Sequence, residues 1–381
     1  MQKIVLLFIF LGVFASCKND KPNNKTEEIG IAKGDSLKIK YAKGFQIHTF
    51  KGYKTITLKN PWPGTNKVFT YALVEKNGSV SNPENYDAVV QVPLKRIVVT
   101  STTHIPSLEM LGENETLVGF PSLDYISSEK TRQRISEGKI AEIGKNENIN
   151  TEILIDLAPD AVIGFAIDGN NSTFATIEKT GIPVLYNEDW TETSPLGKAE
   201  WIKFFGILFN KEKEADSIFK TIETEYLAAK KTASQAKETP TVISGAMFKD
   251  VWIMPQGKSW GAQFIADANG NYLWKDSKGT GSLSLSVESV LDKGKNAKIW
   301  IGPGQFTSLN EMKGANKVYS QFAAYTTGSV FSYSSKKGET GGVVYFELAP
   351  NRPDLVLKDL IKIFHPELLP THGLYFFDKL K

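Results

Sequence analysis

Cysteine is nearly absent from this chain of 381 residues, and Cys17 is the only one. A single thiol cannot form an intramolecular disulfide, so a hydrophobic core must hold the fold, and a chain this long can bury one. Histidine is also scarce. A bare zinc or manganese site would use about three histidines with a carboxylate, whereas the four here are scattered: His48, His104, His365 and His372. The sequence therefore predicts neither disulfides nor a bare-metal site.

The chain also lacks an excess of charge of either sign. The 45 Lys and Arg residues oppose 42 Asp and Glu residues, which leaves a formal net charge of +3. This balance argues against a nucleic-acid partner. No apolar run approaches the roughly 18 residues that a transmembrane helix needs. The body of the protein is therefore predicted to be soluble.

The first 17 residues have the order of a secretory signal. Met1-Gln2-Lys3 is a short basic start, residues 4–14 are apolar or Gly, and Ala15-Ser16 places small residues before Cys17. This segment resembles a bacterial lipoprotein signal, which implies cleavage before Cys17, acylation of that residue and attachment to the periplasmic or cell-surface side of a membrane. Residues 1–16 are assigned as signal peptide. The polar residues 17–36 are assigned as a flexible, lipid-anchored tether.

Residues 37–95 have the pattern of a small β structure. Short runs of strand-forming residues at 46–50, 53–58 and 68–74 are separated by turns that contain Gly or Pro. We expect an N-terminal antiparallel hairpin or meander that is attached to a larger domain.

From residue 96 onward, short apolar strands alternate with helices. Strands are predicted at 97–100, 117–120, 161–165 and 183–186, and helices at 105–111, 151–157 and 172–180. After residue 240 the alternation resumes, with strands at 242–246, 251–254, 298–301 and 330–333, and helices at 262–268, 287–291 and 353–364. The strand at 251–254 is expected beside the one at 242–246. This alternation indicates an α/β fold with mainly parallel sheets in two lobes, 96–210 and 239–381.

A helical region separates the two α/β parts. One helix is predicted at 198–208 and a longer one from 211 to about 236. Apolar residues of the longer helix recur every three or four positions and form one stripe: Ala215, Ile218, Phe219, Ile222, Tyr226, Ala229 and Ala233. A helix of about 26 residues is ~39 Å long. Residues 211–238 are assigned as the connection between the lobes.

The two halves have acids at matching places. Glu152 begins the run Glu-Ile-Leu-Ile-Asp, and Glu288 begins Glu-Ser-Val-Leu-Asp. Ala161 and Ala297, at the strands that follow, are each nine residues further on (161 − 152 and 297 − 288). This repetition on either side of the long helix indicates that one lobe is a duplicate of the other.

Several segments occur in a characteristic order and spacing: Lys95–Val99, Leu108–Gly112, Leu157–Ile163, Gly181–Val184 and Asn351–Leu360. Over residues 96–381 the chain resembles the helical-backbone (class III) substrate-binding proteins, which serve ABC importers of iron chelates, haem and vitamin B12. The resemblance implies two Rossmann-like lobes joined by one long rigid helix, with the ligand in the cleft between them. It also implies a binding protein without catalysis and without a cofactor of its own, expected as a monomer.

The resemblance further implies an ABC permease dimer as partner. In the family, one surface glutamate on each lobe meets arginine pockets on the two permease subunits, and Glu152 and Glu288 match those positions. Arg–carboxylate pairing adds direction to such a contact. The alternative is that each acid only complements the N-terminus of its own helix, worth roughly 0.3–1 kcal/mol.

Ligands of open α/β sheets bind beyond the carboxyl ends of the strands. The residues near these ends are therefore the candidate ligand contacts: His104, Asp124, Tyr125, Asp168, Trp190, Phe248, Trp252, Trp260, Phe306, Tyr333, Lys336 and Arg352. The aromatic rings offer flat apolar surface to a large organic ligand, although about half are expected in the core. Arg352 is the best cation for a ligand carboxylate or chelate oxygen. His104, as a lone histidine, is more often structural than a ligand.

Other functions remain open. No nucleophile elbow, phosphate loop or dinucleotide fingerprint follows a strand, so an enzyme is not expected, although Asp124 and Asp168 could form a carboxylate pair of the kind found in glycosidases. A surface lipoprotein that captures ligand without an ABC partner is another alternative, for which Lys18-Asn19-Asp20 is a hint. The sequence favours a lipid-anchored protein that binds a metal chelate, first a ferric siderophore, then cobalamin (vitamin B12) or haem.

Overall fold

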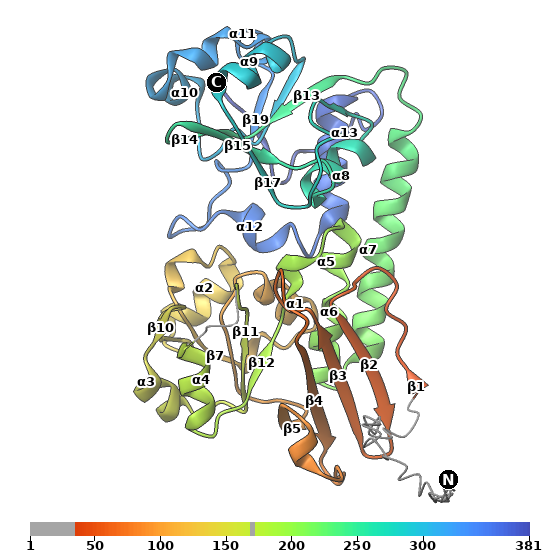
Figure 1. The fold of residues 1–381 in the computed structure, drawn as a ribbon, viewed down its shortest axis with the longest axis vertical. Helices are drawn as coiled ribbons and strands as arrows, with labels where there is room; N and C mark the ends of the chain where they lie inside the picture. The colour runs from red at the N-terminus through yellow and green to blue at the C-terminus, as the bar shows by residue number, and fades with distance from the viewer. Residues whose placement is uncertain (1–34, 168–171) are drawn as a thin grey trace, which may run out of the picture. The chain divides into compact units, whose positions relative to one another are not determined.

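The first lobe is built on a five-stranded sheet in which all strands are parallel (Figure 1). The computed structural model describes residues 35–167 and 172–381. The central strands are short apolar runs that are buried on both faces, as a parallel sheet covered by helices requires. In spatial order the strands are β12 (Val184–Tyr186), β11 (Ala161–Gly164), β6 (Ile97–Val99), β7 (Leu117–Phe120) and β8 (Ala141–Glu142). The predicted α/β class is therefore confirmed for this lobe.

Helices and short turns connect these strands. They are α1 (His104–Met110), η2 (Asn114–Thr116), η3 (Leu123–Tyr125), α2 (Glu129–Ser136), α3 (Thr151–Leu157), α4 (Ser172–Lys179) and η4 (Asp189–Thr191), with a hairpin of β9 (Gly144–Lys145) and β10 (Asn148–Ile149). The side chain of Asn150 caps α3 by accepting the N–H of Glu152 at 3.0 Å. This helix ends at Ala158, which has a left-handed conformation (φ 43°).

The second lobe repeats this arrangement. Its sheet consists of β16 (Asn271–Tyr272), β13 (Thr241–Ser244), β18 (Ile299–Ile301), β19 (Val330–Ser332) and the antiparallel β20 (Asp378–Lys379). When the edge strands β8 and β20 are left out, the remaining four strands of each lobe, numbered along the chain, have the same spatial order: second, first, third, fourth (β7-β6-β11-β12 and β16-β13-β18-β19). This identity of topology agrees with the duplication that the two acidic motifs indicate. The surrounding helices are α8 (Trp260–Asp267), α9 (Val287–Gly294), α10 (Leu309–Ala315), η5 (Lys317–Gln321), α11 (Ala323–Thr326), α12 (Val344–Leu348) and α13 (Pro353–Phe364).

One predicted pairing is wrong. The strand β15 (Val251–Pro255) does not pair with β13 but lies between β14 (Ala246–Phe248) and β17 (Ser282–Leu285) in a separate antiparallel sheet. The cause is Gly245, which has a left-handed conformation (φ 78°) and ends β13. A Cβ at Gly245 would lie 1.9 Å from the carbonyl oxygen of Ile253. The close approach and the turn that make the hairpin therefore both require glycine.

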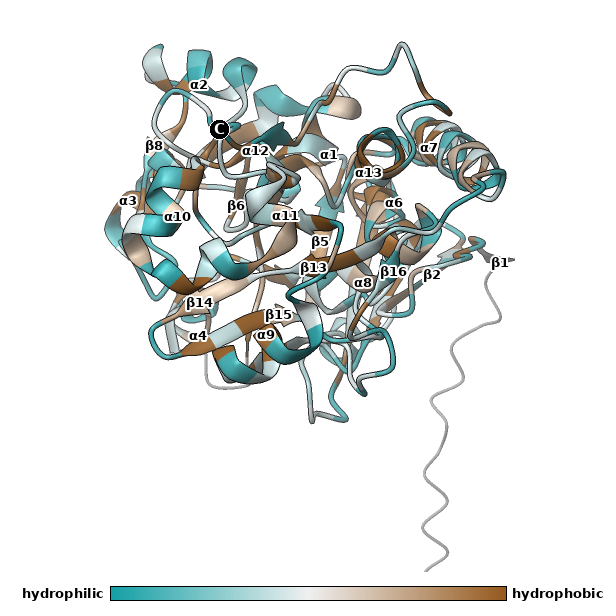
Figure 2. Ribbon diagram, turned by 90° about the horizontal axis from the view of Figure 1, so that it is seen from above, coloured by the Kyte–Doolittle hydropathy of each residue, from teal (hydrophilic) through white to brown (hydrophobic). Residues whose placement is uncertain are grey.

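Helix α7 (Glu212–Ala233) extends beside both lobes (Figure 1). Its apolar stripe is divided between two hydrophobic cores. Ala215, Phe219 and Ile222 belong to the core of the first lobe, and Tyr226, Ala229 and Ala233 to that of the second. Figure 2 shows α7 next to α13. One helix thus contributes to both hydrophobic cores, and its range, Glu212–Ala233, is shorter than the predicted 211–236.

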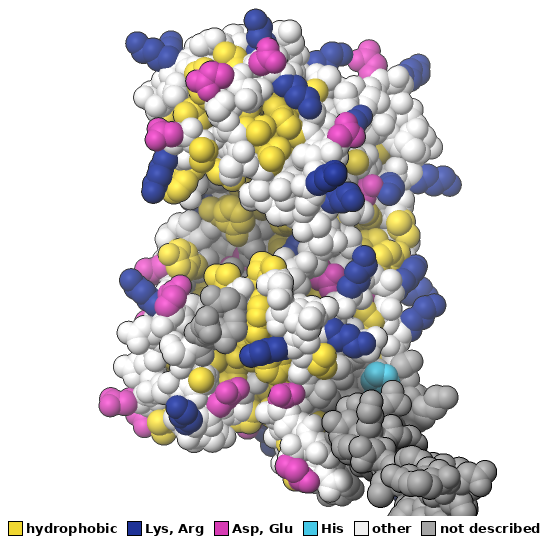
Figure 3. Space-filling view, in the orientation of Figure 1, with side chains coloured by type: hydrophobic (Ala, Val, Ile, Leu, Met, Phe, Trp, Pro, Cys, Tyr) yellow, Lys and Arg dark blue, Asp and Glu magenta, His cyan; other side chains and the backbone are white. Residues whose placement is uncertain are grey.

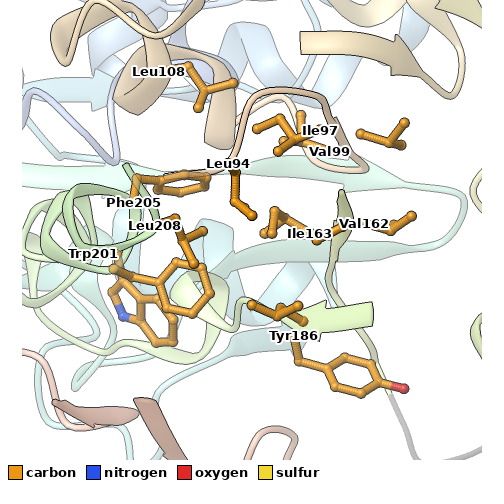
Figure 4. Packing of buried hydrophobic residues seen from close by; sticks show 14 of the residues in the cluster. Leu94, Ile97, Val99, Leu108, Val162, Ile163, Tyr186, Trp201, Phe205 and Leu208 are labelled. Carbon is orange, nitrogen blue, oxygen red and sulfur yellow. The ribbon is translucent and has the colours of Figure 1, made fainter. Parts of the chain in front are cut away.

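The helix predicted over 198–208 consists of two helices, α5 (Pro195–Ala199) and α6 (Ile202–Leu208). Every residue of α6 is buried. Figure 4 shows Phe205 and Leu208 of α6 beside Leu94 and the strand residue Ile163. Helix α6 therefore lies within the core of the first lobe, between its parallel sheet and the long helix.

The N-terminal residues form a five-stranded sheet in sequence order, larger than the expected hairpin or meander. The strands are β1 (Asp35–Ser36), β2 (Phe45–Phe50), β3 (Tyr53–Lys59), β4 (Val68–Glu75) and β5 (Ala88–Val92), with η1 (Pro83–Asn85) before the last. Pairing is antiparallel except between β4 and β5. Phe45, Ile56 and Tyr71 are buried in the same core as the parallel sheet of the first lobe. Trp62, to which sequence patterns assigned no structure, packs against Tyr186 with 6.0 Å between the two ring centroids.

Two buried carboxylates bind the segment between β1 and β2. Glu200 accepts the backbone N–H groups of residues 40–42 at 2.6–3.0 Å. Glu192 accepts those of residues 43 and 44 at 2.7 and 2.9 Å. The Tyr41 hydroxyl donates to Glu223 of α7 at 2.6 Å. The N-terminal sheet is therefore bonded to the region where the two lobes are connected.

Within residues 35–167 and 172–381, no helix combines the length and the hydrophobicity that crossing a membrane requires. The predicted signal peptide, Cys17 and most of the tether lie outside the described residues.

Candidate ligand-binding site

A cavity of about 1020 Å³ lies between the two lobes. Figure 3 shows the surface hollowed there, with hydrophobic side chains in the hollow. The first lobe contributes residues 190–193, which follow β12, and Pro63 from the turn between β3 and β4. The second lobe contributes most of the wall, from residues 244–248 at the end of β13 and in β14, 259–261 at the start of α8, and the loop after β18. The carboxyl ends of parallel strands from both lobes therefore meet at this cavity.

The cavity brings together five of the predicted ligand contacts: Trp190, Phe248, Trp260, Phe306 and Tyr333. Trp190 and Phe248 are exposed, with 38% and 66% of their surface accessible. Tyr333 stacks on Tyr345 at a centroid separation of 4.3 Å. These rings give the site extended apolar faces from both lobes. Their contact with a ligand stays a prediction.

Two other candidates lie in hydrophobic cores and do not line the cavity. Trp252 is fully buried, stacks on Trp300 at 5.2 Å and donates its indole N–H to the carbonyl of Ser244 at 2.9 Å. His104 is also fully buried, with its ring 5.4 Å from that of Phe205. Burial lowers the pKa of His104 to about 4, so this ring is neutral at physiological pH. Position after a strand does not decide which way a side chain points.

The two predicted cations are paired elsewhere. Arg352 forms a bidentate pair with Asp354, at 2.9 and 2.7 Å, and Lys336 lies 3.1 Å from Asp378. Neither lines the cavity.

The remaining candidates are two neighbours and one residue that is not described. Asp124 and Tyr125 belong to η3, are exposed and do not line the cavity. The carbonyl of Asp124 accepts the hydroxyl of Thr340 from the second lobe at 2.9 Å. Asp168 lies outside the described residues.

Sequence reasoning missed several aromatic residues of the wall, among them Phe264, Tyr345, Phe346 and Phe377. Tyr345 and Phe346 lie on α12, a five-residue helix, too short for hydrophobic periodicity to reveal. The adjacent aromatic pair in the run Val-Val-Tyr-Phe-Glu-Leu was the available signal.

The wall contains no basic side chain among its described residues. Its charged members are Glu192 and Glu311. Both are engaged already, since Glu192 accepts backbone N–H groups and Glu311 accepts the N–H of Thr307 at 2.8 Å. Hydrogen bonds from Thr307 lower the pKa of Glu311. The cavity thus presents apolar and neutral polar surface to a ligand. No group of three or more His, Cys, Asp or Glu side chains in the described part of the chain is placed to hold a metal ion.

A polar contact joins the lobes at a second place besides α7. The carboxylate of Glu347, on α12, accepts the backbone N–H groups of residues 127 and 128 at 2.7 and 3.0 Å. Asn351 accepts the hydroxyl of Ser107 and donates to the carbonyl of Thr103, both at 2.8 Å. Figure 1 shows α12 between the two lobes. Separation of the lobes on this side would break these hydrogen bonds.

We expect Glu347 to make stability depend on pH. Burial, together with the nearby Glu109, raises its pKa from 4.5 to about 7 in the folded chain. The neutral form therefore favours folding: the stabilisation is complete below about pH 4.5 and is lost as the pH rises through about 7. Between about pH 5 and pH 8 the free energy of unfolding should fall by about 1–3 kcal/mol more in the parent than in Glu347→Gln. Urea titrations at both pH values measure this, and equal pH dependence in the two proteins would contradict it.

Glu152 and Glu288 occupy equivalent positions in the two lobes. Each is the second residue of its helix, after a cap at Asn150 or Ser286 whose side chain accepts helix N–H groups. Both glutamates are exposed. The strands that follow, β11 and β18, each pair with the first strand of their own lobe's parallel sheet. The structure therefore places two exposed carboxylates at matching points of the duplicated lobes.

Two lobes of the same topology, a long helix beside both and an apolar cavity between them define the class of two-lobed solute-binding proteins. Residues 97–336 match the model of the periplasmic binding protein family. Because this match covers more than half of the 381 residues, the chain belongs to that family. The resemblance drawn from the sequence motifs is confirmed.

Individual proteins are similar over long stretches. The uncharacterized lipoprotein MJ0878 of Methanocaldococcus jannaschii is 27% identical, over 98% of this chain and 95% of its own. A periplasmic heme binding protein from Pseudomonas aeruginosa has a TM-score of 0.57 at 14% identity, over 76% of this chain and 98% of its own. A possible iron-binding (periplasmic solute-binding) protein from Staphylococcus epidermidis has a TM-score of 0.56 at 18% identity, over 72% and 99%. At these identities the two structures show a shared fold.

Proposed function

We propose that this chain is a lipid-anchored substrate-binding protein that captures a metal chelate between its lobes and delivers it to an ABC importer permease. The observation on which the proposal depends is the cavity of about 1020 Å³, lined by aromatic rings from both lobes. Its size lies at the upper end of the range for small-molecule sites and suits a large organic ligand. The lipoprotein name of the relative from Methanocaldococcus jannaschii supports the anchor at Cys17 and a location on the periplasmic or cell-surface side.

The charge of the wall favours an uncharged or cationic ligand. A strongly anionic catecholate chelate would require cations to offset the loss of its hydration, and the described wall offers none. The two candidate cations, Lys336 and Arg352, are paired with carboxylates away from the cavity. A ferric siderophore of the hydroxamate type fits this surface, because its own oxygens satisfy the iron and its exterior is largely neutral.

Haem fits less well. A haem iron is commonly held by an axial His, Cys, Met or Tyr. The described wall contains no His or Cys. Of its two methionines, Met254 is 2% exposed and the sulfur of Met247 accepts the amide N–H of Asn316 at 3.4 Å. Tyrosine would bind as its phenolate, yet burial raises the pKa of Tyr333 and of Tyr345 in the wall. Cobalamin requires no protein ligand to its metal and suits the aromatic lining, so it is the second candidate.

The test is a tryptophan-fluorescence titration of the full chain with four probes: ferrioxamine B, ferric enterobactin, cyanocobalamin and hemin. We expect saturable quenching with ferrioxamine B and none with ferric enterobactin. Metal-free desferrioxamine is the control for the chelate itself. Saturation with cyanocobalamin alone would replace the siderophore by cobalamin, and absence of saturable binding with all four would refute the proposal.

Within this site, Trp260→Ala should weaken binding of the chelate about tenfold or more. Trp260 lines the cavity at the start of α8, and loss of a central aromatic contact costs about 2 kcal/mol or more. Trp274→Phe is the matched control, because Trp274 is buried in the same lobe but does not line the cavity. Titration of both variants measures the effect. Equal affinities in the two variants would contradict it.

A further inference from the structure

The indole of Trp190 is held at its N–H by a buried carboxyl group. Glu188 is 1% exposed, and its Oε2 accepts the indole N–H of Trp190 at 2.6 Å. The other oxygen, Oε1, accepts the backbone N–H of Ala166 at 3.0 Å. One side chain thus links Trp190 to the segment that follows β11. A hydrogen bond to so buried an acceptor restricts the direction of the indole ring.

A buried ammonium group holds the backbone of the same residue. Nζ of Lys198, on α5, donates to the carbonyls of Asp189 and Trp190 at 2.9 and 3.0 Å. The same Nζ lies 5.1 Å from the ring centroid of Trp260, within the range of a cation–π contact. Lys198 is 7% exposed and does not line the cavity. Lys198 therefore contacts both tryptophans of the cavity wall, one from each lobe, without lining the cavity itself.

We propose that Glu188 and Lys198 are positioning residues that hold Trp190 and Trp260 as two preset faces of the ligand site. This inference rests on the proposed function for the role of the site, and on the contacts above for its geometry. Ligand then binds without the ordering of two large side chains, which would otherwise weaken affinity.

The arrangement also restricts what Trp190 can recognise. The indole N–H, which is the only hydrogen-bond donor of the Trp190 side chain, is bonded to Glu188. A ligand therefore meets only the face and the edge of the ring. Burial raises the pKa of Glu188 to about 9. A neutral carboxyl group behind the ring adds no negative charge to the wall. Trp190 is thereby suited to an apolar or uncharged portion of the ligand.

The first arm of the test needs no ligand. Acrylamide quenching and anisotropy of Trp190 are obtained by subtracting, for each protein, the signal of the same protein with Trp190→Phe. A neutral carboxyl group keeps lone pairs on both oxygens, whereas Glu188→Gln places an NH2 group, which cannot accept, opposite one of the two donors. Lys198→Met removes the cation while keeping a similar length. In both variants we expect at least a twofold rise in the quenching constant of Trp190 and a lower anisotropy. Glu115→Gln, at an exposed acid of the same lobe, is the control.

The second arm measures affinity for ferrioxamine B and cyanocobalamin, with a drop of about tenfold expected in both variants. Circular dichroism checks the fold, and Glu188→Asp replaces Glu188→Gln if that variant does not fold. An unchanged Trp190 signal in both variants overturns the inference, as does a changed signal with unaltered affinity. If the parent binds no probe, the proposed function fails, while the fluorescence arm still decides whether these residues position Trp190.

Discussion

Uptake is expected to be abolished when Glu152 and Glu288 are both replaced by alanine, while affinity for the ligand is unchanged. The two carboxylates are exposed at equivalent helix positions, do not line the cavity, and take part in no ion pair within the described residues. Loss of a hydrogen-bonded charge pair at an interface costs about 2–5 kcal/mol. Loss of two should weaken docking about a thousandfold or more. Uptake of a radiolabelled ferric hydroxamate by cells with the cognate importer, together with fluorescence titration, measures both quantities.

The chain offers a matched control on the same two helices. Asp156 and Asp292 are exposed and lie one helical turn after the glutamates, so their double replacement by alanine removes equal charge. Uptake should persist in that control. Normal uptake in the glutamate variant would favour the surface lipoprotein that acts without an ABC partner. Loss of ligand binding in it would refute the assignment of these residues to docking.

Glu200→Ala should lower the free energy of unfolding by about 3–5 kcal/mol, the usual effect of breaking a buried ion pair. Glu200 is fully buried, accepts the backbone N–H groups of residues 40–42, and lies 3.0 Å from Nζ of Lys203, which is also buried. Its removal leaves these donors without their acceptor, and a buried unpaired donor costs about 1–3 kcal/mol. The N-terminal sheet would lose part of its attachment to the lobes.

Guanidinium titration followed by circular dichroism measures this change. Glu115→Ala, an exposed acid of the same lobe, should change stability by less than about 0.5 kcal/mol. A loss below about 1 kcal/mol in Glu200→Ala would mean that the segment before β2 is held by other contacts.

Local pattern was sufficient for the parallel sheets and several helices. A strand that is buried on both faces must be apolar at every position, so runs such as 97–99 and 161–164 are recognisable without a partner. Helix α13 has the predicted bounds, Pro353–Phe364, because Pro353 suits the first turn and Pro366 follows the end. The stripe on α7 gave its length within a few residues, since a period of three to four residues is a property of the helix itself.

The candidate site was predicted only in part. The rule that ligands bind at the carboxyl ends of strands selected Trp190, Trp260 and Phe306, which line the cavity. The same rule selected Trp252 and His104, which are buried in cores. Whether a side chain faces a cavity depends on strand pairing and register, and these depend on residues far away in the sequence.

The α/β class, the long helix and the family could be predicted from the amino-acid sequence, because each of these follows from periodicity or from motifs within short windows. Three features required the folded chain: which rings meet at the cavity, the pairing of Arg352 and Lys336 away from it, and the contact of α12 with the first lobe. These features are contacts between segments up to about 250 residues apart, as for Asn351 with Thr103 (351 − 103 = 248). Such contacts form because the packed lobes bring the segments together, and no local pattern of residues encodes them.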